Sequence, residues 1–253
     1  MVNYSKKESV ATITLCREVS RNCINDQVAG EFNDIRGEIQ RDKDIRVVII
    51  TAEGQDVFCA GTDTQAALAF EDRAKLLELF SVAAIIDTFT CPVFAAINGA
   101  ALGQGLELAL ACDLRICSQN ATFAMPQVTC GEVPWDGGTQ RLSRLVGRGK
   151  ALEMVLLGES IDAQEALRIG LVHKVVPLGE LMRTVQEMAH KIADQSPISL
   201  AYAKEAIHKG MDLTLDQGLR LEADLYYLIH TTRDRTEGIT AFREKRKPQF
   251  EGK

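Results

Sequence analysis

The stretch that most constrains this chain is residues 97–113, which read INGAALGQGLELALACD. An apolar run at residues 93–97 precedes it, and the Asn-Gly pair at 98–99 is a turn signal directly after that run. Helical spacing of apolar residues then begins behind a glycine pair. The sequence therefore predicts a buried strand, a tight turn and a helix in immediate succession.

The same stretch has the composition of a reaction site. Gly103 and Gly105 flank Gln104, so the backbone here can approach a ligand closely. Free N–H groups at a helix start can hold an oxygen that gains negative charge during a reaction. Glu107 follows about one turn later and can move a proton beside that oxygen. A plain strand–helix turn with an exposed glutamate is the alternative interpretation.

Strand and helix patterns alternate along the first part of the chain. The run VVIIT at residues 47–51 is continuous and apolar, which is typical of a strand covered on both faces. The expected order is strand 9–15, helix 26–42, strand 47–51, helix 70–89, strand 93–97, the helix within 97–113, and strands 114–117 and 121–124. This alternation predicts an α/β fold of stacked right-handed units.

The second part of the chain is mainly helical. The longer helices are expected at 181–195, 197–209, 215–230 and 236–247. We therefore divide the chain into an α/β body with the active site at 1–177 and a helical C-terminal segment at 178–253. Residues 215–230 carry apolar side chains on more than one face, so we expect them to pack on a partner subunit or on the body.

Composition excludes several classes of protein. The net charge of −6 disfavours a nucleic-acid binder and provides no basic patch for a membrane. No apolar run is long enough to span a bilayer, and the polar start MVNYSKKESV does not resemble a secretory signal. The seven cysteines include no CxxC pair, and the four histidines have no metal spacing. We expect a cytoplasmic protein without a metal or a redox cofactor.

Five stretches together carry a resemblance to a known family. They are FCAGTD at 58–63, the stretch at 97–113, FAMPQVTCGEVPWDGGTQRLSRLVG at 123–147, AQEALRIGLVHKVVP at 163–177 and EGITAFREKRKPQF at 237–250. In this order and spacing the chain resembles the enoyl-CoA hydratase/isomerase (crotonase) superfamily nearly end to end. The resemblance implies a crotonase-like α/β spiral of ββα units with a C-terminal helical trimerisation segment. It also implies a homotrimer or homohexamer and an acyl-CoA thioester as substrate, with no separate cofactor.

The resemblance assigns a shared chemistry to three residues. Members of the family stabilise a thioester enolate with two backbone N–H groups, which correspond here to those of Thr62 and Gln104. The family usually has glycine at the second position, so Gln104 must fit the local backbone and its side chain can narrow the pocket. Glu107 matches the first catalytic glutamate of the family.

The second catalytic carboxylate of the family's hydratases is missing. Its position is Gln127 in FAMPQ, and an amide exchanges no proton near neutral pH. By resemblance to family members with an aspartate in the following loop, Asp136 is a candidate proton carrier, and capping the helix near residue 139 is its alternative role. Trp135, the only tryptophan, either lines an acyl pocket or packs in the core.

The resemblance also implies contacts to CoA. Arg21 matches a basic residue that faces the CoA phosphates, and Ala60 and Asp63 flank the loop that meets the adenine. Phe242 and Lys245 match a terminal motif that closes over CoA, in some members from the neighbouring subunit. Solvated surface charge is the alternative for Arg21 and Lys245.

These residues lead to one main function and two alternatives. The main one is an enoyl-CoA hydratase/isomerase-type lyase or isomerase acting on a conjugated or cyclic enoyl- or dienoyl-CoA, with Glu107 as its acid–base residue. The alternatives are an ordinary short-chain enoyl-CoA hydratase and a non-catalytic acyl-CoA-binding homologue.

Overall fold

The computed structural model comprises residues 1–253 and describes all of their side chains except that of Arg73. A six-stranded sheet runs in the order β1-β2-β3-β5-β7-β10 and is parallel except for the β1–β2 pair. Its strands are β1 (Val2–Lys7), β2 (Val10–Leu15), β3 (Val47–Ala52), β5 (Val93–Ile97), β7 (Leu114–Ser118) and β10 (Lys174–Val176).

The structure has a second, four-stranded sheet, whose first three strands alternate along the chain with strands of the first sheet. It consists of β4 (Val57–Cys59), β6 (Ala100–Leu102), β8 (Thr122–Ala124) and β9 (Ile161–Asp162), in that order. Each of β3, β5 and β7 in the large sheet is followed along the chain by a strand of the small sheet and then by a helix. The α/β fold of stacked units expected from the sequence is thus confirmed.

Helices cover both faces of the large sheet. The body helices are α1 (Asp26–Arg41), α2 (Thr64–Leu68), α3 (Arg73–Phe80), α4 (Val82–Asp87), α5 (Gln104–Ala111), α6 (Gly138–Val146), α7 (Arg148–Leu157) and α8 (Ala163–Arg168). Every residue of β3 is buried. Val48 and Ile50 belong to the main core with α1 and α5, whereas Val47 and Ile49 belong to a second cluster with α9 (Leu181–Ala193). The prediction of a strand buried on both faces is therefore confirmed.

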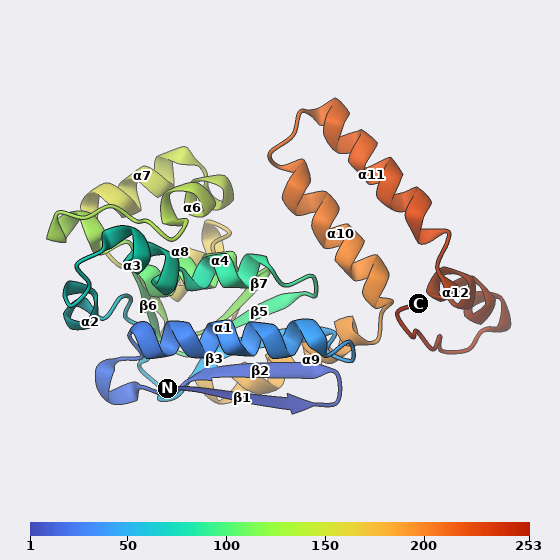
Figure 1. Ribbon diagram of the computed structural model, residues 1–253, viewed down its shortest axis with the longest axis horizontal. Coiled ribbons are helices and arrows are strands. Elements are labelled where there is room, and N and C mark those ends of the chain that lie inside the picture. Colours follow the sequence, from blue (N-terminus) through green and yellow to red (C-terminus); the bar gives the residue numbers. More distant parts are fainter.

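The last three helices extend away from the body. Figure 1 shows α10 (Pro197–Gly210) and α11 (Leu215–Ile229) side by side, with α12 (Arg233–Glu244) beyond them. One attachment of α10 is Lys204, whose Nζ donates to Asp113 Oδ2 at 2.7 Å and to the Cys91 carbonyl at 2.9 Å. By packing, α9 belongs with the body, and the projecting segment begins at Pro197.

The helix expected at residues 70–89 is wrong as a single element. It is divided at Ser81 into α3 and α4. The hydroxyl of Ser81 donates to Asp136 Oδ1, and the N–H of Ala83 in the first turn of α4 donates to Asp136 Oδ2. A carboxylate that is distant in sequence thus satisfies the start of a new helix, and no local periodicity signals this break.

Candidate active site

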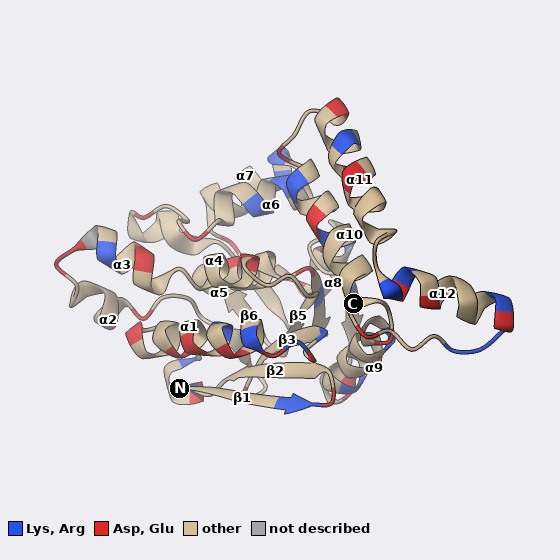
Figure 2. Ribbon diagram, turned by 45° about the vertical axis from the view of Figure 1, so that its right-hand side comes forward, with Lys and Arg blue, Asp and Glu red and all other residues tan. Residues whose placement is uncertain are grey.

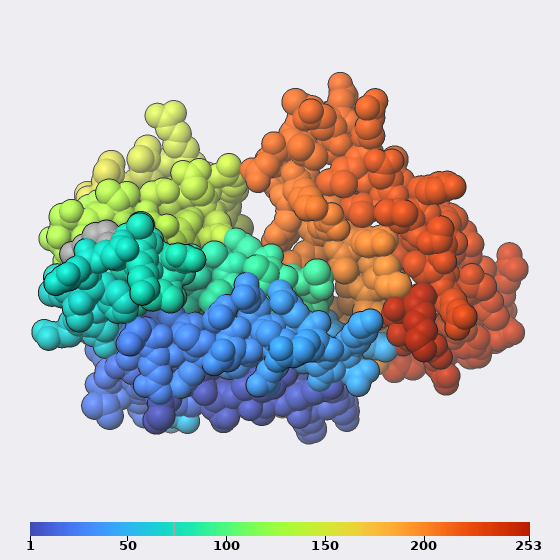
Figure 3. Space-filling view, viewed as in Figure 1, coloured from blue at the N-terminus to red at the C-terminus, as the bar shows by residue number. Residues whose placement is uncertain are grey.

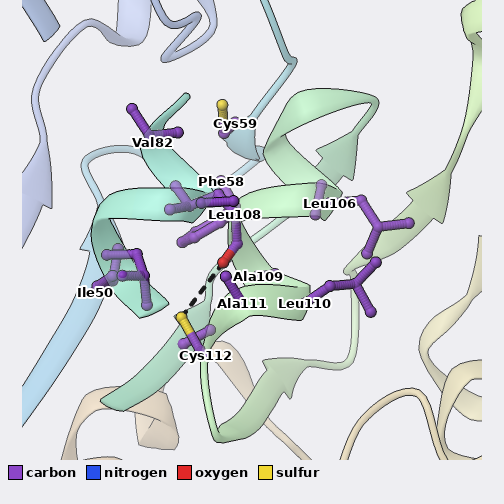
Figure 4. Close-up of a cluster of buried hydrophobic side chains, with 14 of the residues drawn as sticks. Ile50, Phe58, Cys59, Val82, Leu106, Leu108, Ala109, Leu110, Ala111 and Cys112 are labelled. Carbon is purple, nitrogen blue, oxygen red and sulfur yellow. Dashed lines mark hydrogen bonds between the residues drawn. The ribbon is translucent and has the colours of Figure 1, made fainter. Parts of the chain in front are cut away.

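Glu107 is carried by a helix buried on all sides. All eight residues of α5 are buried, and Figure 4 shows Leu106 and Leu110 on one side of it and Leu108 on the other, beside Phe58. Glu107 itself is fully buried. The alternative of an exposed glutamate on a plain turn is therefore wrong. Because α5 is packed on every face, it holds this carboxylate at a fixed place.

The carboxylate of Glu107 is held by the loop before α6. Its Oε1 accepts hydrogen bonds from the N–H of Asp136 at 2.9 Å and from that of Gly138 at 2.8 Å. Burial raises the pKa of Glu107 to about 7, and the N–H of Gly138 partly offsets this effect. A carboxyl group with this pKa can accept and return a proton near neutral pH.

Two backbone N–H groups lie beside this helix start. Among the hydrogen bonds of the described residues, neither the N–H of Thr62 nor that of Gln104 has a protein acceptor. The two loops are close, because a methyl group added to Gly61 would lie 3.3 Å from Gln104 N. Such a pair of donors can hold an oxyanion.

The residue with a left-handed backbone conformation at this turn is Gly103. Its φ of 53° is in the left-handed region, whereas Gln104 begins α5 with a helical backbone. The side chain of Gln104 is buried and accepts a hydrogen bond from Thr62 Oγ1 at 2.8 Å. A glutamine therefore fits at this position without backbone strain.

Asp136 lies beside Glu107 but its carboxylate faces other groups. It accepts from Ser81 Oγ at 2.6 Å, from Ala83 N at 3.1 Å and from Gln104 Nε2 at 3.1 Å. Burial raises the pKa of Asp136 against the effect of these donors. The alternative role as the cap of the next helix is wrong, because α6 begins after Gly137 without a side-chain cap.

Gln127 is adjacent to the free side of Glu107. Its Nε2 lies 3.4 Å from Glu107 Oε2, and among the described residues its buried Oε1 has no hydrogen-bond partner. The amide therefore presents an acceptor beside the carboxylate. Trp135 is half-buried and packs against the main core, one residue from Asp136.

The residues expected at the CoA site lie on two joined loops. Arg21 is exposed, and its carbonyl accepts from the N–H of Ala60 at 3.1 Å. The carboxylate of Asp63 accepts from Arg17 Nη2 at 3.2 Å and from the N–H of Ala66 at the start of α2. The structure thus brings Arg21, Ala60 and Asp63 together near Thr62.

Phe242 and Lys245 are not near these loops in the same chain. Both are exposed on or directly after α12, which lies at the opposite end of the molecule from α2 and α3 (Figures 1 and 2). Figure 2 also shows basic residues on the segment that follows α12. A role of these two residues at a CoA site therefore requires a second copy of the chain.

Sequence reasoning missed four residues that position the site. They are Arg17, Ser81, Gly138 and Arg141. Arg141 Nη1 donates to the Asp136 carbonyl at 2.9 Å, and its Nη2 pairs with Asp87. A methyl group at Gly138 would lie 2.7 Å from Glu107 Oε1. Among these four residues, only the glycine at 138 indicates a close contact from its residue type. Backbone N–H donors cannot be recognised from residue types.

Two further properties concern the described residues only. They include no group of three or more His, Cys, Asp or Glu side chains placed to hold a metal ion. No helix among them combines the length and the apolar character that crossing a membrane requires.

Comparisons with known proteins agree with this geometry. The profile of the enoyl-CoA hydratase/isomerase family matches residues 5–253. The chain is 40% identical to the short-chain-enoyl-CoA hydratase of Clostridium acetobutylicum, over 97% of this chain and 95% of the relative. It is 39% identical to the 2,3-dehydroadipyl-CoA hydratase of Escherichia coli, over 98% of both.

Solved structures give the same result. The crystal structure of an enoyl-CoA hydratase from Bacillus anthracis superposes with a TM-score of 0.96 at 38% identity, covering 100% of this chain and 99% of that one. The chain therefore belongs to the enoyl-CoA hydratase/isomerase family of enzymes.

Proposed function

We propose that this enzyme moves a proton on an enoyl- or dienoyl-CoA thioester, with Glu107 as its one acid–base carboxylate. The N–H groups of Thr62 and Gln104 hold the thioester oxygen while it carries negative charge. The observation that carries this proposal is the Glu107 carboxylate, which is fixed by two backbone N–H groups and faces an amide, Gln127, on its other side.

The proposed step is a double-bond shift. Glu107 removes a proton from a carbon next to the double bond, and the electron pair moves through the conjugated system onto the thioester oxygen. Glu107 then returns the proton to another carbon, so no second reactant is consumed. A conjugated or cyclic acyl group suits this step, because it spreads the charge. Trp135 precedes Asp136, whose N–H holds Glu107, and is the candidate to contact a flat acyl group.

Hydration is the second candidate, and one observation favours it. The buried Oε1 of Gln127 can accept a hydrogen bond from a water molecule that Glu107 deprotonates. The hydroxyl would add to Cβ, and the proton on Glu107 would pass to Cα. The hydratases among the relatives also favour this reaction. With one titratable side chain facing the water, we expect it to be slow on crotonyl-CoA.

One pair of substrates tests whether Gln127 limits hydration. Wild type and the Gln127→Glu variant are assayed on crotonyl-CoA and on a cyclic dienoyl-CoA, with Gln119→Glu as an exposed control. We expect wild type to favour the dienoyl-CoA, and Gln127→Glu to gain crotonyl-CoA hydration by at least about tenfold, since a second acid–base group contributes about 10²–10⁴. A wild type that hydrates crotonyl-CoA near the diffusion ceiling of about 10⁸ M⁻¹s⁻¹ contradicts the proposal.

We also propose that the enzyme works as a homotrimer or a dimer of trimers. The projecting helices expose apolar side chains, and the most exposed of them are Ile207, Met211, Leu215, Tyr226, Tyr227 and Phe242. Between α6 and α10 lies a cavity of about 580 Å³ lined partly by Leu145, Ile207 and Met211, and Figure 3 shows a hollow between these parts of the molecule. Apolar surface of this extent is typical of a subunit interface.

In such an assembly Phe242 and Lys245 of one subunit would reach the CoA that binds at Arg21, Ala60 and Asp63 of the next. Light scattering at micromolar concentration tests the assembly, and a monomeric mass contradicts it. Lys245→Ala should raise KM for an acyl-CoA several-fold and leave kcat unchanged, because a contact to CoA is made equally before and during the reaction.

A further inference from the structure

The side chain of Gln104 uses both ends of its amide inside the protein. Its Oε1 accepts from the hydroxyl of Thr62 at 2.8 Å, and its Nε2 donates to the Phe80 carbonyl at 2.5 Å and to Asp136 Oδ2 at 3.1 Å. Thr62 and Gln104 are also the two residues whose backbone N–H groups form the proposed oxyanion hole. One side chain thus ties the two donors of the hole to each other.

Asp136 continues the same network to the base. Its carboxylate receives the amide of Gln104, while its backbone N–H donates to Glu107 Oε1 at 2.9 Å. Ser81 and Ala83 hold the remaining positions of this carboxylate. Asp136 is buried, with 4% of its surface exposed, so water does not compete for these contacts.

We infer that Gln104 and Asp136 are positioning residues that set the oxyanion hole and the Glu107 carboxylate at one fixed separation. This inference rests on the proposed function, because it assigns the hole and the base to those residues. The series Thr62, Gln104, Asp136, Glu107 is continuous through three hydrogen bonds. A displacement of either linking side chain therefore moves both reacting groups.

The geometry favours this role of Asp136 over proton transfer. A proton carrier needs a carboxylate oxygen that can reach the substrate, whereas three protein donors occupy the two oxygens of Asp136. Asp136 then contributes to the reaction through Gln104 and Glu107, without touching the substrate.

Two variants break the link from opposite sides. Gln104→Met keeps the backbone N–H and nearly the same side-chain volume but removes the amide. Asp136→Asn keeps the N–H that holds Glu107 but removes the negative charge and puts an NH₂ group in place of one of the two oxygens that accept from Ser81, Ala83 and Gln104. Gln119→Met and Asp44→Asn are matched controls, because both side chains are exposed. Thermal unfolding establishes that every variant is folded.

We expect each single variant to lower kcat by about 10- to 100-fold with less than about a threefold change in KM. The double variant should be no more than about threefold slower than the slower single variant, since both changes break one network. Losses that multiply would overturn the inference.

The pH profile separates positioning from proton transfer. The negative charge of Asp136 raises the pKa of Glu107. In Asp136→Asn this charge is lost, so the part of the pH profile in which the rate rises as Glu107 loses its proton should move to lower pH. Disappearance of a limb would overturn the inference and make Asp136 a carrier.

A measurement that does not depend on catalysis is the binding of acetoacetyl-CoA, whose enolate has its own ultraviolet absorbance. Wild type should bind it as the enolate, and each variant should reduce its affinity at least about tenfold, because the hole is displaced. A wild type that binds no enolate overturns the proposed function and this inference with it. A wild type that binds the enolate and variants that bind it equally well overturn the inference alone.

Discussion

The N–H of Gly138 lies 2.8 Å from Oε1 of Glu107, so the first residue of α6 holds the carboxylate that α5 carries. Gly138 has the space of a hydrogen atom only: a methyl group there would lie 2.7 Å from Glu107 Oε1 and 2.9 Å from both Met125 Cε and Pro134 Cβ. The position of the Glu107 carboxylate therefore depends on a residue without a side chain.

Gly138→Ala should lower kcat by at least about tenfold, because the new methyl group displaces the Glu107 carboxylate. Overpacking at this buried site should also reduce the free energy of unfolding by about 1–3 kcal/mol. Gly149→Ala is the matched control, since its methyl group would meet no atom within 4 Å. Steady-state kinetics and urea unfolding of both variants check this. Equal activity of the two would refute the steric account of the site.

The stability of Glu107→Gln should depend on pH differently from that of wild type. Burial raises the pKa of Glu107 from its usual 4.5 to about 7 in the folded state. As pH rises through this window, the unfolded chain releases a proton that the folded chain keeps, so wild type loses stability there. The loss approaches about 3 kcal/mol for a difference of this size.

The glutamine variant has no such proton and should be the more stable protein at pH 8, although inactive. Urea unfolding at pH 5 and pH 8 measures the difference, with the exposed Glu132→Gln as control. If the free energy of unfolding changes equally between pH 5 and pH 8 in wild type and in Glu107→Gln, burial does not raise this pKa.

The fluorescence of Trp135 should report the acyl group. It is the only tryptophan, and its neighbour Asp136 contacts Glu107 directly. We expect an enoyl-CoA to change the emission intensity or wavelength, because the acyl chain replaces water at the exposed part of the ring. CoA without an acyl group is the control. If the thioester and free CoA give the same change, Trp135 does not line the acyl pocket.

The parts of the site that follow from local sequence could be predicted. The apolar strand at 93–97, the glycines and the helix that follows are contiguous, so their spacing indicates free N–H groups at the helix start and the place of Glu107. The resemblance, not the spacing, assigns the donor to Gln104. The exposed edge strand β1 was missed, because most of its residues are polar and exposed.

The remaining parts depend on contacts between distant residues. Ser81 divides a helix because Asp136, 55 positions later, accepts its hydroxyl. The two groups that hold Glu107 Oε1 are backbone N–H groups, which every residue except proline has, so no residue type predicts them. The sequence predicts Asp136 as a proton carrier or as a cap of α6. Its carboxylate contacts the start of α4, so the cap is wrong, whereas the role in proton transfer stays a prediction.

The most direct test of the account is kcat/KM as a function of pH for wild type and Glu107→Gln on a dienoyl-CoA, with Glu132→Gln as control. If Glu107 is the base, wild-type kcat/KM should rise with pH to a plateau with a midpoint of about 7, since this profile reports the free enzyme. Glu107→Gln should be at least about 100-fold slower at every pH and lack that limb. A folded Glu107→Gln protein that retains the wild-type rate and profile would contradict the account.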